Sequence, residues 1–181
     1  MITKNMTMTQ CSTTPSASEA IDLPDAARRL AGILQTLGHP GAIVMLPESG
    51  RTSAQAASGL GCDVAQIAKS IIFRRLADDA PILVIASGAN RVDEAKVAAQ
   101  VGAIGKANAH YVRDKTGYAI GGVAPIAHAT PPLTLIDADL LALNSLWAAA
   151  GHPHAVFELS PQQLVTMTGA PVVDIAQRDA P

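Results

Sequence analysis

The segment from Ile82 to Ala86 is apolar at every position, and it constrains the fold more than any other feature of the chain. A strand with one solvated face alternates apolar and polar residues, so an unbroken apolar run of this length predicts a strand buried on both faces. Apolar residues make up 49% of the 181 residues and charged residues only 15%, which excludes a disordered chain. The sequence therefore predicts a central strand inside a folded domain.

Helix and strand patterns alternate on both sides of this run. Several connections are too short for parallel crossovers, so we expect a single α/β domain with a mixed, curved sheet and flanking helices. The stretch between residues 137 and 150 mixes polar and apolar residues, and no strand is predicted there. Periodicity and capping residues predict helices over 24–38, 52–61, 93–102, 108–117 and 160–169, and further strands over 42–46, 67–76, 133–136, 155–159 and 172–175.

Charge and terminal composition bound the function. Residues 1–20 are rich in Thr, Ser and Met without periodicity, so we expect a mobile arm before one domain at 21–181. No secretory signal or membrane span is visible, and Cys11 and Cys62 have no metal or redox spacing, so we expect a cytoplasmic protein with no membrane partner. A net charge of −2 argues against a broad nucleic-acid-binding surface and leaves room for a local basic patch.

Lys69 is the first candidate for chemistry. A strand over this segment places Lys69 on one face with Ile67, Ile71 and Phe73. Burying an ammonium among apolar residues is costly unless the charge finds a partner or a water-filled cleft. Two interpretations follow: a lysine at a strand end whose ammonium reaches water along an apolar stem, or an ammonium that faces an active-site cleft.

The segment from Gly117 to Pro125 is the second candidate. Its pair Gly121-Gly122 lets the backbone approach a ligand closely and direct N–H groups at an anion or a developing oxyanion. An ordinary turn after the end of a helix explains the same residues. The spacing matches neither the dinucleotide-binding nor the P-loop glycine motif.

Other polar residues point to chemistry less directly. His128, His152 and His154 suggest a metal, but no Cys or carboxylate stands at a spacing typical of zinc, so no metal or other cofactor is expected. No nucleophile elbow is present, which argues against a covalent nucleophile. Asp137 follows the strand predicted over 133–136, where a carboxylate either faces a cleft or caps the next helix.

Taken together, these segments resemble the YbaK/prolyl-tRNA editing domain family. The resemblance runs from Thr52 to Ile175, and each of its parts is weak alone, but their order along the chain makes the match strong. It rests on the Ala-rich segment 52–61, on Gln66-Ile67-Ala68-Lys69-Ser70-Ile71-Ile72-Phe73, on Gly117-Tyr118 with Gly121-Gly122-Val123-Ala124-Pro125, on Ile136-Asp137, on Gly151, and on Phe157-Glu158-Leu159-Ser160-Pro161 with Leu164.

The resemblance implies an enzyme that acts in trans on mischarged tRNA. Members of the family hydrolyse the aminoacyl ester, mostly on tRNA(Pro) that carries a small non-cognate amino acid. A proline pocket cannot strongly reject a similar or smaller side chain by binding alone, so a second site must remove the error. The implied partners are the tRNA acceptor end and prolyl-tRNA synthetase.

The resemblance also implies roles for particular residues. Lys69 would hold the phosphate or sugar of the terminal adenosine, and Gly121 and Gly122 would contribute backbone N–H groups near the ester carbonyl. The ribose 2′-OH of the substrate would assist, so no protein base is required. The expected substrate-binding residues, which shape the pocket, set its selectivity or receive the α-ammonium, are Ser70, Val123, Ala124, Pro125, His128 and Asp137.

Two other classes of function compete with this one. The same fold without turnover would be a binding module for an aminoacyl-adenosine or a small amino acid. Having both Lys69 and an intact Gly-Gly-x-x-Pro segment favours the enzyme, because a decayed module tolerates the loss of either. A metal hydrolase that uses the three histidines named above is the more distant alternative.

Overall fold

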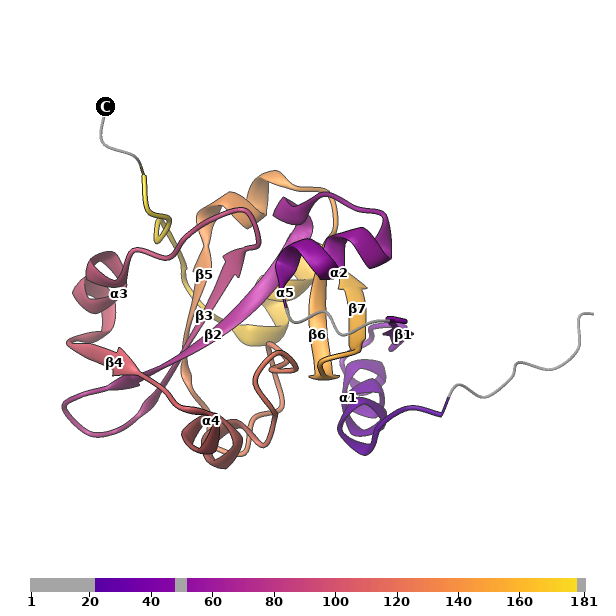
Figure 1. Ribbon diagram of the computed structural model, residues 1–181, viewed down its shortest axis with the longest axis horizontal. Helices are drawn as coiled ribbons and strands as arrows, with labels where there is room; N and C mark the ends of the chain where they lie inside the picture. Colours follow the sequence, from indigo (N-terminus) through magenta and orange to yellow (C-terminus); the bar gives the residue numbers. More distant parts are fainter. Residues whose placement is uncertain (1–21, 48–51, 179–181) are drawn as a thin grey trace, which may run out of the picture.

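The computed structural model describes residues 22–47 and 52–178, and they form one open, mixed sheet with helices around it (Figure 1). The arm expected over residues 1–20 lies outside the described residues, and the domain boundary at residue 21 stays a prediction. The helices are α1 (Asp25–Thr36), α2 (Ser53–Leu60), α3 (Glu94–Val101), α4 (Ala109–Thr116) and α5 (Pro161–Thr168), with short 3-10 turns η1 (Val64–Gln66) and η2 (Ala138–Ala142).

The sheet is built around two long antiparallel strands, β2 (Ile67–Arg75) and β3 (Pro81–Ser87). The remaining strands are β1 (Val44–Met45), β4 (Ile104–Lys106), β5 (Leu133–Asp137), β6 (Leu146–His152), β7 (Ala155–Leu159) and β8 (Val172–Val173). Their order is β1-β7-β6-β2-β3-β5-β8, and β4 pairs with the far end of β2. Parallel pairing of β2 with β6, β3 with β5 and β5 with β8 makes the sheet mixed, as predicted.

Strand β3 is buried on both faces, which confirms the prediction from its apolar run. Leu83 and Ile85 contribute to one hydrophobic cluster together with residues of α1, α4 and α5. Ile82, Val84 and Ala86 contribute to a second cluster with Val97 of α3. Alternate side chains of one strand therefore join two separate cores, and β3 fixes both layers of helices relative to the sheet.

Local capping signals set several helix ends. The side chain of Thr52 accepts a hydrogen bond from Gln55 N, and Gln55 bonds back to Thr52 N, which is a capping box at the start of α2. Ser160 and Gln163 form the same arrangement at α5, where Pro161 occupies the first helical position. These two motifs were readable in the sequence, and the structure confirms both.

Two strands, β4 and β6, were not predicted from the sequence patterns. Strand β6 contains Leu146, Trp147 and three successive alanines, and alanine favours helices over strands. It is a strand because β2 and β7 pair with it on either side. Strand β4 has only three residues, which is too short to show a period. In both cases tertiary pairing overrides weak local preference.

Candidate active site

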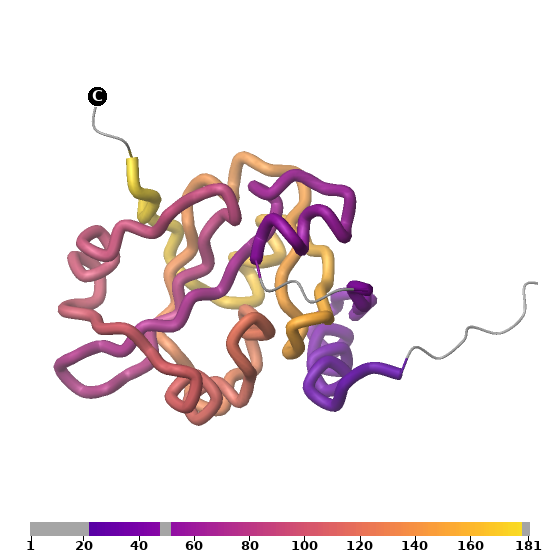
Figure 2. Tube along the Cα trace, in the orientation of Figure 1, coloured from indigo at the N-terminus to yellow at the C-terminus, as the bar shows by residue number. Residues whose placement is uncertain are grey.

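A cavity of about 360 Å³ opens where β2 and β6 separate. The two strands pair only at Ile67–Trp147 and Ala68–Ala148, and beyond these pairs they diverge. Helix α2, the loop after Gly117 and the turn between β6 and β7 enclose the space. Figure 2 shows this loop beside the β6–β7 turn. The lining residues are Thr52, Ser53, Ala56, Ile67, Ala68, Lys69, Ser70, Ile71, Ile120, Gly121, Val123, Trp147, Ala149, Pro153 and Val156.

Among the described residues that line the cavity, Lys69 alone carries a charge at neutral pH, and its side chain is half-buried. Its ammonium donates a hydrogen bond to the main-chain oxygen of Asn90. Burial lowers the pKa of the Lys69 ammonium, and the negative charge of Asp137 acts in the opposite direction. The structure thus places Lys69, a partly desolvated cation, among the residues that line the cavity, and its role in an active site stays a prediction.

Asp137 is fully buried and does not line the cavity. One carboxylate oxygen accepts hydrogen bonds from Ser87 N at 3.2 Å and from the Asn90 side-chain amide at 2.8 Å. The other accepts from Asp139 N at 3.2 Å and caps η2. This placement agrees with the capping alternative and differs from the expectation of direct substrate contact. Asp137 instead holds the turn that carries the partner of Lys69.

The glycine loop contributes to the cavity through Gly121 and Val123. Gly121 has φ +84°, a conformation that L side chains rarely adopt. The N–H groups of Gly121 and Val123 have no acceptor among the residues that the structure describes. Neither N–H group is therefore committed to an acceptor within the described residues.

Gly122 has a supporting position instead. Its N–H donates to Ala119 O at 2.9 Å, so it is used inside the turn. A Cβ on Gly122 would lie 2.8 Å from main-chain atoms of His152. Gly122 is needed because the loop contacts the β6–β7 turn closely, and it is not among the residues that line the cavity.

Ser70 follows Lys69 and also lines the cavity. Its hydroxyl oxygen is buried and has no hydrogen-bond partner within the described parts of the chain. A buried hydroxyl without a partner is unfavourable, so such groups in native proteins call for an explanation.

The remaining predicted residues stand behind the cavity wall. Ala124 and Pro125 are buried next to Val123 and do not line it. The imidazole of His128 bonds to Ala124 O at 2.8 Å through Nε2 and meets the ring of Tyr118 edge to face. Burial lowers the pKa of His128. These contacts of His128 hold the loop in place on the side away from the cavity. Its expected part in selectivity stays a prediction.

A metal centre finds no support in the described residues. No group of three His, Cys, Asp or Glu side chains among them converges on one point. His152 and His154 lie close together, with ring centroids 5.5 Å apart, but Nδ1 of His152 accepts from His154 N.

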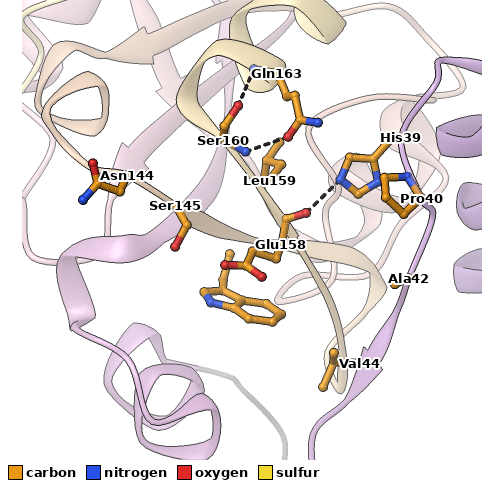
Figure 3. Close-up of a pocket in the computed structure, with 11 residues that line it drawn as sticks. His39, Pro40, Ala42, Val44, Asn144, Ser145, Glu158, Leu159, Ser160 and Gln163 are labelled. Atoms are coloured by element: carbon orange, nitrogen blue, oxygen red, sulfur yellow. Dashed lines mark hydrogen bonds between the residues drawn. The ribbon is translucent and has the colours of Figure 1, made fainter.

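A second hollow of about 430 Å³ lies next to His39 and Glu158 (Figure 3). Several of its polar groups already have protein partners, whereas the Glu158 carboxylate has none among the described residues. His39 bonds to Glu158 O at 2.8 Å and accepts from Gly41 N, and Gln163 accepts from Ser160 N. These bonds join the end of α1 to β7 and cap the start of α5, so these polar groups serve the fold.

Some residues of the site had no interpretable signal in the sequence. Asn90 lies in a turn, and its role depends on a contact with a lysine far away in the chain. Trp147, Ala149 and Pro153 line the cavity from β6 and the turn after it. They were missed because β6 itself was not predicted.

Comparison with known proteins identifies the class. The aminoacyl-tRNA editing domain family matches residues 47–167, and the chain belongs to this family. It is 40% identical to a solved structure described as a candidate trans-editing enzyme for prolyl-tRNA synthetase, with a TM-score of 0.80 over 86% of this chain and 99% of that one. The family and fold predictions are therefore confirmed.

Two further relatives agree. The solved structure of the hypothetical protein APE2540 is 28% identical, with a TM-score of 0.76 over 82% of this chain and 99% of that one. The uncharacterized protein YwhH of Bacillus subtilis (strain 168) is 32% identical over 117 residues, which are 64% of this chain and 74% of the relative. None of the helices in the described residues is long and apolar enough to cross a membrane.

Proposed function

We propose that this chain hydrolyses the aminoacyl ester of mischarged tRNA in trans, with tRNA(Pro) carrying a small non-cognate amino acid as the substrate. Membership of the editing family supports the reaction class. The 40% identity to a candidate trans-editing enzyme for prolyl-tRNA synthetase supports this tRNA and supports a partnership with that synthetase. The reaction would take place in the cytoplasm, where tRNA is charged.

The observation that carries the proposal is that one cation and two residues with uncommitted N–H groups line the same cavity. Lys69 lies on one wall, and the N–H groups of Gly121 and Val123 belong to another. A cation suits the negatively charged end of a tRNA, and N–H donors suit the oxyanion that forms when water attacks an ester. Among the lining residues there is no His, Asp, Glu or Cys to act as a base or nucleophile. An aminoacyl ester is already activated, so positioning and a polarised carbonyl are sufficient.

The size and lining of the cavity favour a small side chain. Its 360 Å³ is near the lower end of ligand pockets, which span roughly 300–1,000 Å³. Ile71, Val123 and Val156 give it an apolar lining. A cavity of this size that must also admit part of a ribose leaves little room for a large amino acid.

The test is a deacylation panel on tRNA(Pro) charged separately with alanine, cysteine, serine and proline. We expect release of a small non-cognate amino acid at a rate well above spontaneous hydrolysis, with prolyl-tRNA(Pro) spared. The same amino acids on a non-proline tRNA test whether the tRNA matters. Tight binding of the charged tRNA with no release would establish the binding module instead, and loss of turnover in EDTA would establish a metal hydrolase.

A further inference from the structure

Most cations in the described residues are neutralised by a neighbouring carboxylate. Arg74 pairs with Asp79 at 2.6 Å and Arg75 pairs with Asp78. The other basic side chains within 4.0 Å of an aspartate are Arg28, Lys96, Lys115 and Arg178. Paired charges attract a distant anion weakly, because the field of the carboxylate cancels that of the cation. Arg74 and Arg75 are therefore poorly suited to bind phosphate.

Three of the five basic side chains without such a partner in the described residues gather at one place. Lys69, Arg91 and Lys106 all line an open groove of about 430 Å³. Arg29 and Arg113 also lack an ion pair there, but they lie elsewhere. A chain with a net charge of −2 thus exposes a local concentration of positive charge on this surface.

The groove adjoins the active-site cavity. Lys69 and Ile71 line both, so the two hollows meet along the same part of β2. The groove continues over Ile72 and Phe73 toward Lys106 on β4. A ligand that places one end in the cavity can therefore extend along the groove without crossing the protein.

The main chain holds the two outer cations in place. The carbonyl of Arg91 accepts a hydrogen bond from Gln177 N, and the neighbouring Val92 pairs with Ala176. Lys106 ends strand β4, where it is paired in register with Phe73 of β2. Both side chains are exposed, whereas the backbone that carries them is fixed by pairing. The groove also contains one acid, Glu94, in the first turn of α3.

We propose that this groove, lined by Lys69, Arg91 and Lys106, binds the phosphodiester backbone of the single-stranded 3′ end of the tRNA. The esterified terminal nucleotide occupies the cavity, and the phosphates of the preceding nucleotides contact Arg91 and Lys106. The apolar floor formed by Ile71 and Phe73, which lie on one face of β2, contacts the sugars and bases between them. This assignment rests on the proposed function for its ligand, and it explains how a weakly acidic chain recognises a polyanion.

The test measures binding of an uncharged acceptor-stem minihelix by fluorescence anisotropy across a salt series, so it does not depend on hydrolysis. Each phosphate contact on a single strand contributes about −0.7 to the slope of log K against log salt, so the double variant Arg91→Gln/Lys106→Gln should flatten the slope by about 1.4. The loss of these two phosphate contacts should also weaken the affinity of the double variant, relative to the native chain, roughly 25-fold at about 0.1 M salt.

Matched variants separate the groove from general charge effects. Arg113→Gln removes an exposed arginine outside the groove and should leave affinity and slope unchanged. Glu94→Gln removes the one acid of the groove and should tighten binding. A minihelix that lacks its single-stranded 3′ nucleotides should bind weakly and equally to the native chain and the double variant.

Three results would overturn the groove assignment. These are no measurable binding of the minihelix by the native chain, an unchanged affinity and slope in the folded double variant, and binding that does not need the 3′ single strand. The deacylation panel judges the proposed function separately, because it measures ester release and not minihelix affinity. A chain that deacylates its substrate but shows any of these three results binds tRNA through another surface.

Discussion

The ammonium of Lys69 donates a hydrogen bond to the main-chain oxygen of Asn90. The side-chain amide of the same Asn90 donates to Asp137 at 2.8 Å and to Asp139 at 2.7 Å. The turn after β3 is thereby anchored to the end of β5, and its carbonyl is presented to the lysine. The position of the one charged group in the cavity depends on a buried carboxylate that does not reach the cavity.

Lys69→Met should reduce deacylation by at least about 100-fold, the scale of losing one transition-state contact. Burial lowers the pKa of Lys69, so the charged form destabilises the fold at neutral pH, and methionine removes that cost. Losing the bond to Asn90 offsets part of this gain, so the melting temperature should stay within about 4 °C. Single-turnover rates and thermal melts give both values.

The matched control is Lys96→Met. Lys96 is also partly buried and also donates to a main-chain oxygen, that of Ala176, but it lies outside the cavity. The Lys96→Met variant should deacylate its substrate at the native rate. Near-normal turnover in a folded Lys69→Met protein would remove Lys69 from the mechanism.

Asp137→Asn should shift the alkaline limb of the pH–rate profile to lower pH. The negative charge of Asp137 raises the pKa of Lys69 against the effect of burial, so removing it lets that pKa fall further below 10.5. The charged ammonium is then lost at a lower pH. The profile must be corrected for spontaneous ester hydrolysis, which also rises with pH.

Asp139→Asn is the control for that shift. The carboxylate of Asp139 accepts hydrogen bonds from Asn90 and Arg178, but it does not contribute to the shift in the pKa of Lys69. Its variant should keep the alkaline limb in place. A limb that moves equally in both variants, or in neither, would show that Asp137 does not set the charge of Lys69.

Gly122→Ala should lower stability more than Gly121→Ala, and both should slow deacylation. A Cβ on Gly122 meets the His152 main chain at 2.8 Å, so the loop must shift, at a cost of about 1–3 kcal/mol. At Gly121 the nearest atoms are 3.8 Å away in Pro153, and the cost comes from φ +84°, about 1–2 kcal/mol. Denaturant melts and single-turnover rates measure the two effects.

Gly32→Ala in α1 provides the reference. A Cβ there has nothing within 4 Å, so the variant should be as stable as the native chain or up to about 1 kcal/mol more stable. Full activity in both loop variants would show that the loop is an ordinary turn without a role in deacylation.

Ser70→Ala should leave the free energy of unfolding unchanged or raise it by about 1 kcal/mol, because it removes a buried hydroxyl that lacks a partner in the described structure. If that hydroxyl binds the substrate, KM rises or the preference among alanine, cysteine and serine changes. Kinetics on the charged tRNA panel measure this. A stable variant with native KM and native preference would leave Ser70 without a role in binding.

Local patterns were enough to predict much of the fold. The apolar run of β3 predicted burial on both faces, and the capping boxes at Thr52 and Ser160 marked two helix starts. Strand β6 was missed because its alanines carry no strand preference and its pairing with β2 and β7 is a long-range property. The residues that β6 brings to the cavity were missed with it.

The sequence by itself indicated the family, the mixed character of the sheet and two candidate segments of the site, those around Lys69 and around Gly121. These are local properties, because burial of a strand, the start of a helix and a flexible glycine turn depend on residues close together in the chain. Only the tertiary structure decided that Asp137 supports Lys69 through Asn90, that Gly122 contacts the His152 backbone, and that Lys69, Arg91 and Lys106 share a groove. Each of these relationships joins residues from different elements. The effect of a charge, a carbonyl or a close contact depends on neighbouring atoms that are distant in the sequence, so local patterns could not predict it.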